Sequence, residues 1–277
     1  MENSVEYQTH VNIVKDLNLY TNIRENQRPI QKKFEEIYSK AKESDVKLDT
    51  AKEFLSSLTD GELNILRKFD GLVDRIDVDA LSDEGAYNLI VHDWEEYDFN
   101  NDGLVSVGIG EQLANIPRQM DDEAKKTWVK TLNSMDMEKD FMSIGIIVMS
   151  FHDDLLKRHF AESLSKLSES EIDEMQKSAS YDIRSFISET LSKPYNPKTI
   201  TVLDILNRVD NMINRTDGGY SSPQLIKSAK RLKESLEKAY AEVKEESKLE
   251  KLTIQKELDI KQEVIAKSNQ KKKNHFL

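Results

Sequence analysis

The sequence predicts a mainly α-helical protein: a helical bundle with a short irregular or β-hairpin-like insert around residues 73–117 and a long C-terminal helix. Helix breakers are rare, with nine glycines and five prolines in 277 residues. Apolar residues recur at helical spacing through most of the chain. We expect three parts: a polar, loosely ordered N-terminus (1–29), a helical domain (30–192), and a C-terminal helical hairpin with a charged helical tail (193–277).

The helical domain is predicted to begin with three helices. Pro29 suits the first turn of a helix whose apolar residues recur at helical spacing: Phe34, Ile37, Tyr38 and Ala41. A second helix is expected over residues 49–58. A third is expected over residues 59–71, because Thr59 and Glu62 form a capping box at its start.

The insert has a different pattern. Residues 73–81 alternate apolar and acidic side chains, which predicts a short strand or an extended connector. Ser82 then begins a short helical turn. Residues 111–122 are expected to be irregular around Pro117, and a further helix is expected from about residue 122 to residue 132.

The longest apolar stretch is predicted to be one helix, capped by Ser134 or Asp136, at the buried centre of the bundle. Its main seam steps by three and four residues: Phe141, Ile144, Val148, Phe151 and Leu155. A second face is also apolar: Met142, Gly145, Ile146 and Met149. The two methionines are expected to fill space in the core rather than to form a partner-binding patch.

Two further helices are expected before the last one. Ser168 and Glu171 form a capping box for a helix reaching Leu191, and the Pro- and Asn-containing run 193–197 breaks the chain. The next helix is expected to end at the Asp-Gly-Gly of residues 217–219. One face of it is predicted to be apolar: Ile200, Leu203, Leu206, Val209 and Ile213.

Ser222 and Pro223 are a suitable cap and first-turn pair for the last helix. This helix keeps apolar residues at heptad spacing: Leu225, Ala229, Leu232, Leu236, Ala239 and Val243. From about Glu245 the pattern decays into Lys and Glu. The tail therefore either projects as a solvated charged helix or pairs with a partner, and the decay favours the first.

Composition excludes several function classes. The net charge of −11 disfavours a broad nucleic-acid-binding face, and the absence of cysteine excludes thiolate metal sites and cysteine nucleophiles. The N-terminus lacks the layout of a secretory signal, and no stretch approaches the roughly 18 apolar residues of a membrane span. Cytoplasmic residence is the default expectation, and export without a cleaved signal stays open.

The segment DFNNDGLVSVGIG, residues 98–110, is the one stretch whose residue types and spacing suggest specific chemistry. Asp98, Asn100 and Asp102 offer side-chain oxygens at alternate positions, as hard cations require, and glycine follows for a sharp turn. Leu104 would add its backbone carbonyl, and Ser106 a direct or water-bridged ligand. The predicted ligand set is Asp98, Asn100, Asp102, Leu104, Ser106 and Glu111.

This segment resembles the first nine positions of an EF-hand calcium loop. The resemblance implies weak Ca²⁺ binding, because position 12 is Ile109 instead of a bidentate Glu and Glu111 follows two residues late. The alternative is a tight turn that leads into a short strand and binds no ion. The longer combination LSDEGAYNLI and DFNNDGLVSVGIG, from Leu81 to Gly110, resembles a pattern in uncharacterised bacterial proteins and implies a small unit of helix, acidic turn and strand.

No other motif predicts catalysis. His152 and His159 are about two helical turns apart, too far to share a metal, so His159 is expected to be a partly buried packing residue and His152 part of a surface patch. The sequence favours a non-enzymatic helical interaction protein of bacterial type with a protein partner. The alternatives are a signal-less exported protein, surface- or flagellum-associated or an effector, and a metal-dependent enzyme that uses acidic residues.

Overall fold

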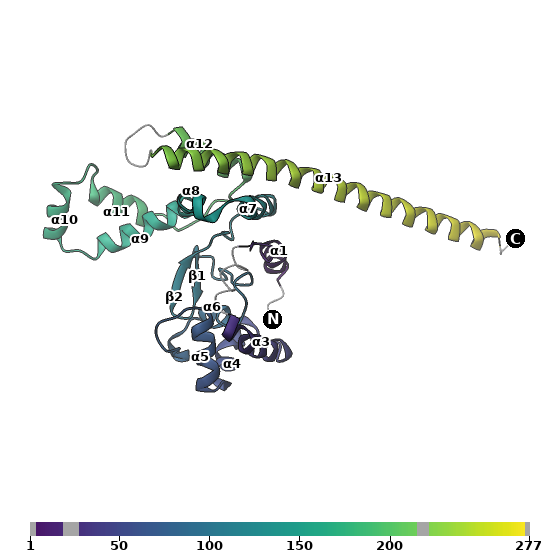
Figure 1. Cartoon of the computed structure of the whole chain (residues 1–277), viewed down its shortest axis with the longest axis horizontal. Coiled ribbons are helices and arrows are strands. Elements are labelled where there is room, and N and C mark those ends of the chain that lie inside the picture. The colour runs from purple at the N-terminus through teal and green to yellow at the C-terminus, as the bar shows by residue number, and fades with distance from the viewer. Residues whose placement is uncertain (1–3, 19–27, 215–221, 275–277) are drawn as a thin grey trace.

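The computed structural model describes residues 4–18, 28–214 and 222–274. Over these residues the chain is mainly α-helical, with one two-stranded antiparallel sheet, so the predicted fold class is confirmed. Figure 1 shows an N-terminal body that carries the sheet, a layer of helices above it, an arm at one side and a long last helix that runs out past both.

The N-terminal body consists of short helices packed on a hairpin. In chain order its elements are α3 (Arg28–Glu43), η1 (Leu48–Thr50), α4 (Ala51–Ser57), α5 (Asp60–Phe69), η2 (Val78–Ala80), α6 (Asp83–Asn88), β1 (Leu104–Val107) and β2 (Gly110–Leu113). The predicted capping box of Thr59 and Glu62 is present on α5. Residues 73–81 were expected to be a short strand or a connector, and they form a connector with one 3₁₀ turn. The expectation of irregular structure over residues 111–122 is wrong for residues 111–113, which lie on β2, and holds for residues 114–121 around Pro117.

The hairpin packs against α6 so closely that a side chain at Gly85 is excluded. A Cβ built on Gly85 would lie 2.2 Å from the carbonyl oxygen of Gly108, and the Gly108 amide donates to the Gly85 carbonyl at 3.0 Å. Gly108 itself has φ +62°, a conformation that suits glycine in the turn between the strands. The helix, acidic turn and strand therefore form one tightly joined unit.

Helix α1 (Val5–Val14) links this body to the helices above it. Ser4 caps the helix by accepting from the Tyr7 amide, and Tyr7 is buried in the core of the N-terminal body. Val14 and Leu17 are buried instead in the core of the upper helices. The expectation of a loosely ordered N-terminus is therefore wrong for residues 4–18, because apolar side chains on both sides of α1 have cores to enter.

The upper layer consists of four helices around a second core: α7 (Asp122–Ser134), α8 (Met137–Phe151), α12 (Val202–Asn214) and α13 (Pro223–Asn274). Trp128 and Val129 of α7 point inward, as predicted. The heptad residues of α13 are also buried as predicted: Leu225, Ala229, Leu232, Leu236, Ala239 and Val243. Because α7 and α8 share this core with α12 and α13, the expected domain boundary at residue 193 does not coincide with a division of the core.

The apolar stretch after residue 136 does not form one central helix. The chain turns at the buried His152, so α8 ends at Phe151 and α9 (Asp153–Ser165) leads away from it. Only one side of α8 is buried, and Phe141, Met142 and Met149 are 65%, 65% and 55% exposed. The expectations of a buried centre and of core methionines are therefore wrong.

The arm is formed by α9, α10 (Glu169–Gln176) and α11 (Ile183–Leu191), with a small core of Leu164, Ile172 and Ile183. The single helix expected from Ser168 to Leu191 is in fact two. The side chain of Gln176 stabilises the break between them, since its oxygen accepts from the Ile183 amide at 2.8 Å and its nitrogen donates to the Tyr181 carbonyl at 2.9 Å.

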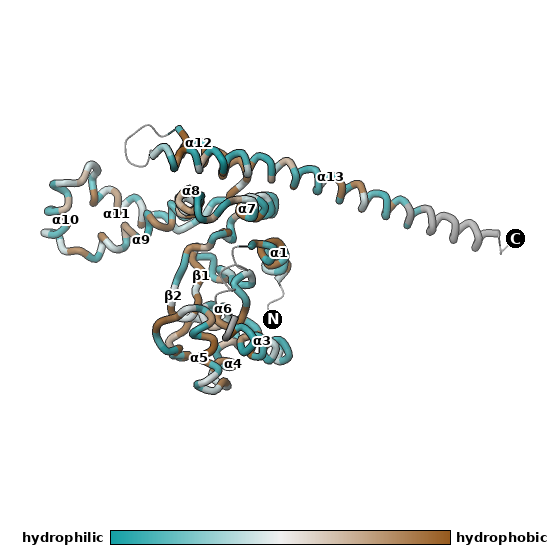
Figure 2. The backbone as a smooth tube through the Cα atoms, viewed as in Figure 1, coloured by the Kyte–Doolittle hydropathy of each residue, from teal (hydrophilic) through white to brown (hydrophobic). Residues whose placement is uncertain are grey.

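The remaining expectations concern α12 and the tail. Leu203 is 65% exposed, so it does not belong to the buried face of α12. The expected stop at residues 217–219 lies outside the described residues. Beyond Val243, α13 continues as a charged helix whose large apolar side chains up to residue 259 are exposed: Leu249, Leu252, Ile254 and Leu258. Figure 2 shows mostly hydrophilic colouring over this part of the helix, in agreement with a solvated tail.

Candidate functional site

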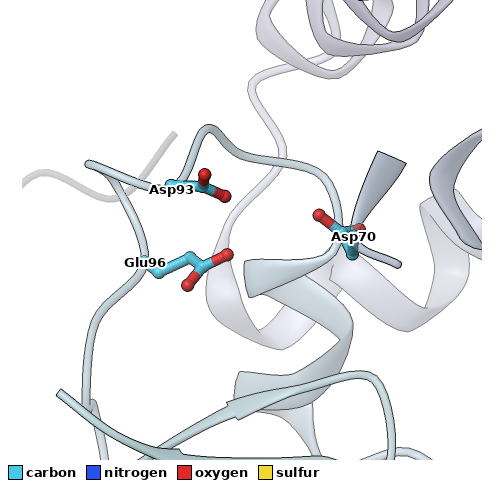
Figure 3. A group of neighbouring side chains, drawn as sticks. All are labelled: Asp70, Asp93 and Glu96. Carbon is cyan, nitrogen blue, oxygen red and sulfur yellow. The ribbon is translucent and has the colours of Figure 1, made fainter. Parts of the chain in front are cut away.

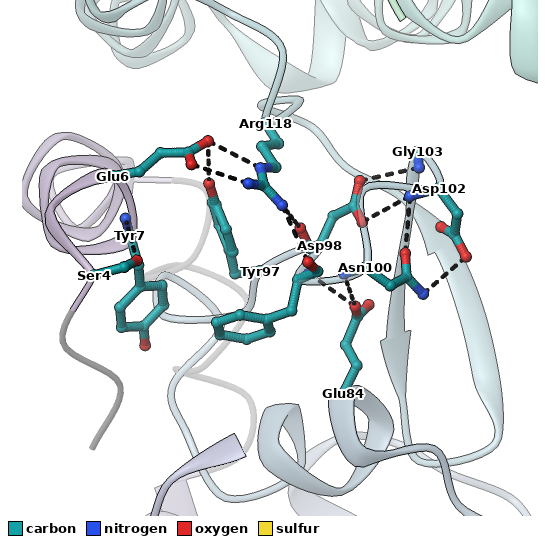
Figure 4. Close-up of polar contacts among 11 residues, drawn as sticks. Ser4, Glu6, Tyr7, Glu84, Tyr97, Asp98, Asn100, Asp102, Gly103 and Arg118 are labelled. Carbon is teal, nitrogen blue, oxygen red and sulfur yellow. Dashed lines mark hydrogen bonds and ion pairs between the residues drawn. The ribbon is translucent and has the colours of Figure 1, made fainter. Parts of the chain in front are cut away.

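The loop that begins at Asp98 is closed by its own first side chain. Asp98 is buried, and its carboxylate accepts from the amides of Asp102 at 3.2 Å and Gly103 at 3.0 Å. Asn101 and Gly103 have φ of +58° and +94°, values that Asn and Gly tolerate best. The chain therefore folds back within six residues, as the sequence predicts (Figure 4).

The next two polar side chains continue the same pattern. The Asn100 oxygen accepts from the Asp102 amide at 2.8 Å, and an Asp102 oxygen accepts from the Leu104 amide at 2.9 Å. The Asn100 amide group also donates to Asp102 Oδ2 at 2.9 Å. Asp98, Asn100 and Asp102 are thus brought together, with both aspartates stabilising turns of the backbone.

Glu84 of α6 holds the loop from below, and sequence reasoning missed it. Its carboxylate is buried and accepts three backbone amides: Phe99 at 2.8 Å, Asn100 at 3.2 Å and Ser106 at 2.8 Å. Burial raises the pKa of Glu84, against the lowering effect of these amides. Glu84 lies 14 residues before Asp98 in the sequence, and no motif spacing connects them; its place in the first turn of a capped helix was the only signal.

Ser106 and Glu111 were predicted to complete the ligand set of the loop, but the structure does not bring them there. Ser106 interacts through its backbone, donating to Glu84 and accepting from the Asn88 side chain at 2.8 Å. Glu111 is exposed and lies opposite Ser106 in the hairpin register. The alternative interpretation, a tight turn that leads into a short strand, describes the observed backbone from Asn101 to Val107. Ion binding by the loop stays a prediction.

The loop also contacts the hinge of the arm. A Cβ on Gly103 would lie 2.5 Å from the Tyr195 hydroxyl and 3.0 Å from Leu155, so any other residue would push these side chains aside, and the φ of +94° also favours glycine. His152, expected in a surface patch, is buried and bonds through Nε2 to the Ala114 carbonyl at 3.0 Å. His159, expected to be partly buried, is exposed. Burial lowers the pKa of His152.

Arg118 ties the start of the loop to α1. Its guanidinium donates to the carbonyls of Asp98 at 3.0 Å and Phe99 at 3.1 Å, and to both oxygens of Glu6 at 2.9 Å. Tyr97 also donates to Glu6. Figure 4 shows these contacts. Arg118 holds the pKa of Glu6 below its usual range. The loop therefore contacts α6 through Glu84, α1 through Arg118 and Glu6, and the arm through Leu155 of α9 and Tyr195, which follows α11.

A second acidic group lies in a cavity of about 360 Å³ beside the hairpin. Asp70, Asp93 and Glu96 present oxygens within 4.8 Å of one another, the only such group of three among the described residues (Figure 3). The sequence did not predict it, because Asp70 is remote from the other two in the chain. Each of the three also takes part in other contacts, so their convergence alone is no evidence for an ion.

His10 of α1 lines the same cavity. It is buried, packs edge-on against Tyr97 at 5.0 Å between ring centres, and its Nδ1 has no hydrogen-bond partner. Burial, together with the charges of Lys125 and Arg118, lowers the pKa of His10 to about 3, and Glu6 opposes this. His10 is therefore neutral at pH 7.

Comparison with protein-family models, with curated proteins and with solved structures finds no match to this chain. A search of the described residues finds no helix that is both long enough and apolar enough to span a membrane.

Replacing Glu84 by Gln should destabilise the protein. Glutamine keeps the size of the side chain but turns an amide group toward backbone donors, so we expect the free energy of unfolding to fall by roughly 2–4 kcal/mol in urea titrations. The exposed Glu111→Gln is the matched control and should change it by less than about 0.5 kcal/mol. Equal effects of the two substitutions would contradict the role given to Glu84.

Stability should fall in acid in a way that depends on His10. The pKa of His10 is lower in the folded chain than in the unfolded chain, so its neutral form favours folding. This contribution to the free energy of unfolding is complete above the unfolded pKa of 6.5 and is lost as pH falls toward 3. Between pH 6.5 and pH 4.5 we expect a loss of roughly 2–3 kcal/mol from this residue. His10→Phe should flatten the profile in urea titrations at each pH, whereas His159→Gln should leave it unchanged; parallel profiles for all three proteins would disprove the assignment.

Proposed function

We propose that this protein works by binding a protein partner, and that the exposed face of α8 is the surface that does so. The observation that carries the proposal is that α8 is apolar on its exposed side as well as on its buried side. Ile144, Ile147 and Val148 are buried beside Asp140 and Ser143, while the large apolar residues Phe141, Met142 and Met149 are exposed. An ordinary surface helix presents charged and polar residues to solvent instead.

The buried polar residues of α8 are fully engaged, which explains how this arrangement is stable. Asp140 accepts from Ser228 at 2.8 Å and from Arg231, both on α13, and the hydroxyls of Ser143 and Ser228 lie 2.6 Å apart. This network fixes the orientation of α8. The apolar face is therefore held outward by specific bonds and is not free to roll into the core.

The composition of the face supports a protein partner. Methionine and phenylalanine are enriched in the buried centres of protein interfaces, and methionine adapts its shape to different partners. In a chain with 33% charged residues, an exposed apolar patch on one helix is typical of an interaction site.

A photo-crosslinking amino acid at position 141 tests this proposal. In cells that produce the protein, p-benzoylphenylalanine in place of Phe141 should give one or a few adducts of defined mass. The same residue in place of Val73, which is 89% exposed on the N-terminal body, is the control and should not give these adducts. The absence of adducts at position 141, or the same adducts at both positions, would refute the proposal.

A second proposed activity is weak calcium binding by the Asp98 loop. It is supported by the folded-back turn, which Asp98, Asn100 and Asp102 close with their side-chain oxygens. Burial raises the pKa of Asp98, and the nearby Asp102 adds to this effect, so a cation would relieve the repulsion between them. The bidentate ligand of position 12 is missing, which places the affinity in the weak range of such sites.

Calcium should stabilise the wild-type protein against urea by about 1.5–2.7 kcal/mol at 10 mM, as a dissociation constant of roughly 0.1–1 mM requires. Asp102→Asn preserves the oxygen that caps the turn and removes the charge, so it should abolish this effect. Asp49→Asn, at an exposed aspartate of the N-terminal body, is the control. No stabilisation of the wild type, relative to chelator, would eliminate calcium binding.

A further inference from the structure

The cavity beside the hairpin has the size of a small-molecule site. Its volume of about 360 Å³ falls within the roughly 300–1,000 Å³ of protein ligand pockets and is larger than a lone metal ion needs. Its wall is built by the end of α5, the segment that leads into the Asp98 loop, the hairpin with the residues after it, and α1. Four separate parts of the chain thus enclose one space.

The wall of this cavity is strongly acidic. Among the described residues, five acidic ones line it: Asp70, Asp93, Glu96, Asp98 and Glu111. Arg118 is the only arginine or lysine among these lining residues, and its guanidinium is bonded to both oxygens of Glu6 and to two backbone carbonyls. Such a wall attracts cations and repels anions, so a ligand of this cavity carries positive charge.

Three of the acidic side chains converge at one place in the wall. Asp70, Asp93 and Glu96 are partly buried, with oxygens within 4.8 Å of one another, and Figure 3 shows them turned toward a common space. Gln112 of β2 donates to Glu96 at 2.9 Å and so holds it in the wall. An ammonium carries three N–H donors and a guanidinium five, so one such group can bond to several of these oxygens at once.

His10 adds a polar group of a different kind to the same cavity. It is 5% exposed, and its Nδ1 has no hydrogen-bond partner among the described residues. A buried polar atom without a partner is costly, and a ligand that bonds to the ring would remove that cost. Because burial keeps the ring neutral, one of its nitrogens accepts a hydrogen bond, and an N–H group of a ligand is a suitable donor.

The converging carboxylates and His10 are close enough for one short ligand to reach both. Tyr97 directly follows Glu96 in the chain, and its ring centre lies 5.0 Å from that of His10. Much of the remaining wall is apolar: Phe69, Leu72, Val105, Val107, Leu113 and Ile116. An aliphatic stem gains free energy by leaving water for such a surface, whereas a hydrated metal ion does not.

We infer that this cavity binds a small organic cation with an aliphatic stem, whose ammonium or guanidinium group lies against Asp70, Asp93 and Glu96. A second N–H group, at the other end of the stem, donates to His10. Because His10 belongs to α1, which has side chains in both large cores, the ligand strengthens the connection between the N-terminal body and the upper helices. This site lies apart from the exposed face of α8 and does not depend on the partner proposed to bind there.

Isothermal titration calorimetry of the full chain with agmatine tests the inference. Agmatine has a guanidinium and an ammonium at opposite ends of a short aliphatic stem. In about 50 mM salt, where screening is weak, it should bind with a dissociation constant below about 1 mM. Butanediol, which is uncharged, and succinate, which is an anion of similar length, should not bind. No heat of binding from agmatine at about 10 mM, or equal binding of butanediol, would overturn the inference.

Substitutions locate the site. Glu96→Gln and Asp93→Asn keep the size of each side chain and remove one charge, so each should weaken agmatine binding at least about tenfold. His10→Phe keeps an aromatic ring beside Tyr97 and removes the ring nitrogens, so it should weaken binding by about threefold or more. Asp49→Asn, at an exposed aspartate outside the cavity, is the matched control and should change nothing. Thermal melts of each variant confirm folding.

A metal site would give a different result. Calcium or manganese that binds to the Asp102→Asn variant, in which the Asp98 loop has lost a charge, and no longer binds when Glu96→Gln is added would assign the carboxylates to a metal if agmatine does not bind. That outcome, or unchanged agmatine binding in both carboxylate variants, would contradict an organic cation in this cavity. Unchanged binding in His10→Phe would disprove the contact assigned to His10.

Discussion

The carboxylate of Glu84 is the constraint on which the N-terminal body depends. It accepts backbone amides on both sides of the Asp98 loop, from Phe99 and Asn100 before the turn and from Ser106 after it. Backbone amides that are buried without an acceptor are costly, so one side chain removes three such penalties at once. It also binds α6 to β1, where the absence of a Cβ at Gly85 permits the two backbones to touch.

The contacts of this loop also position other parts of the chain. Arg118 carries the connection to α1 through Glu6, and α1 places Tyr7 in one core while Leu17, just after it, enters the other. On the opposite side, Tyr195 and Leu155 pack against Gly103, and this contact lies where the arm joins the rest of the molecule. The loop that resembles a calcium site is therefore first a structural junction, and an ion bound there would act on three elements together.

The helices and their caps could be predicted from the sequence because they depend on neighbours in the chain. The Thr59 and Glu62 capping box and the heptad face of α13 are examples of such local rules, and both are present. Glu84, Arg118 and the convergence of Asp70 with Glu96 depend on tertiary packing between residues far apart in sequence. No spacing rule connects such residues, so the sequence indicated only the part of the site that is contiguous, from Asp98 to Asp102.

The wrong expectation for α8 has a different cause and is the more informative. A helix that is apolar on two faces satisfies the rules for a buried position, and the sequence offers no local reason to prefer one face. The face that is buried carries Asp140, which Arg231 and Ser228 bind, together with Ile144, Ile147 and Val148. The partners of Asp140 lie on α13, far away in the sequence, so this face could not be identified from the residues of α8 alone.

On its exposed side α8 carries Phe141, Met142 and Met149, which belong to neither of the two large cores. Gly145 costs an exposed helix about 1 kcal/mol relative to alanine, and a Cβ there would meet no atom within 4 Å, so packing within the chain does not require its small size. Packing within the chain therefore accounts for the buried side of α8 and leaves its exposed side unexplained, which is why the proposed partner surface is placed there.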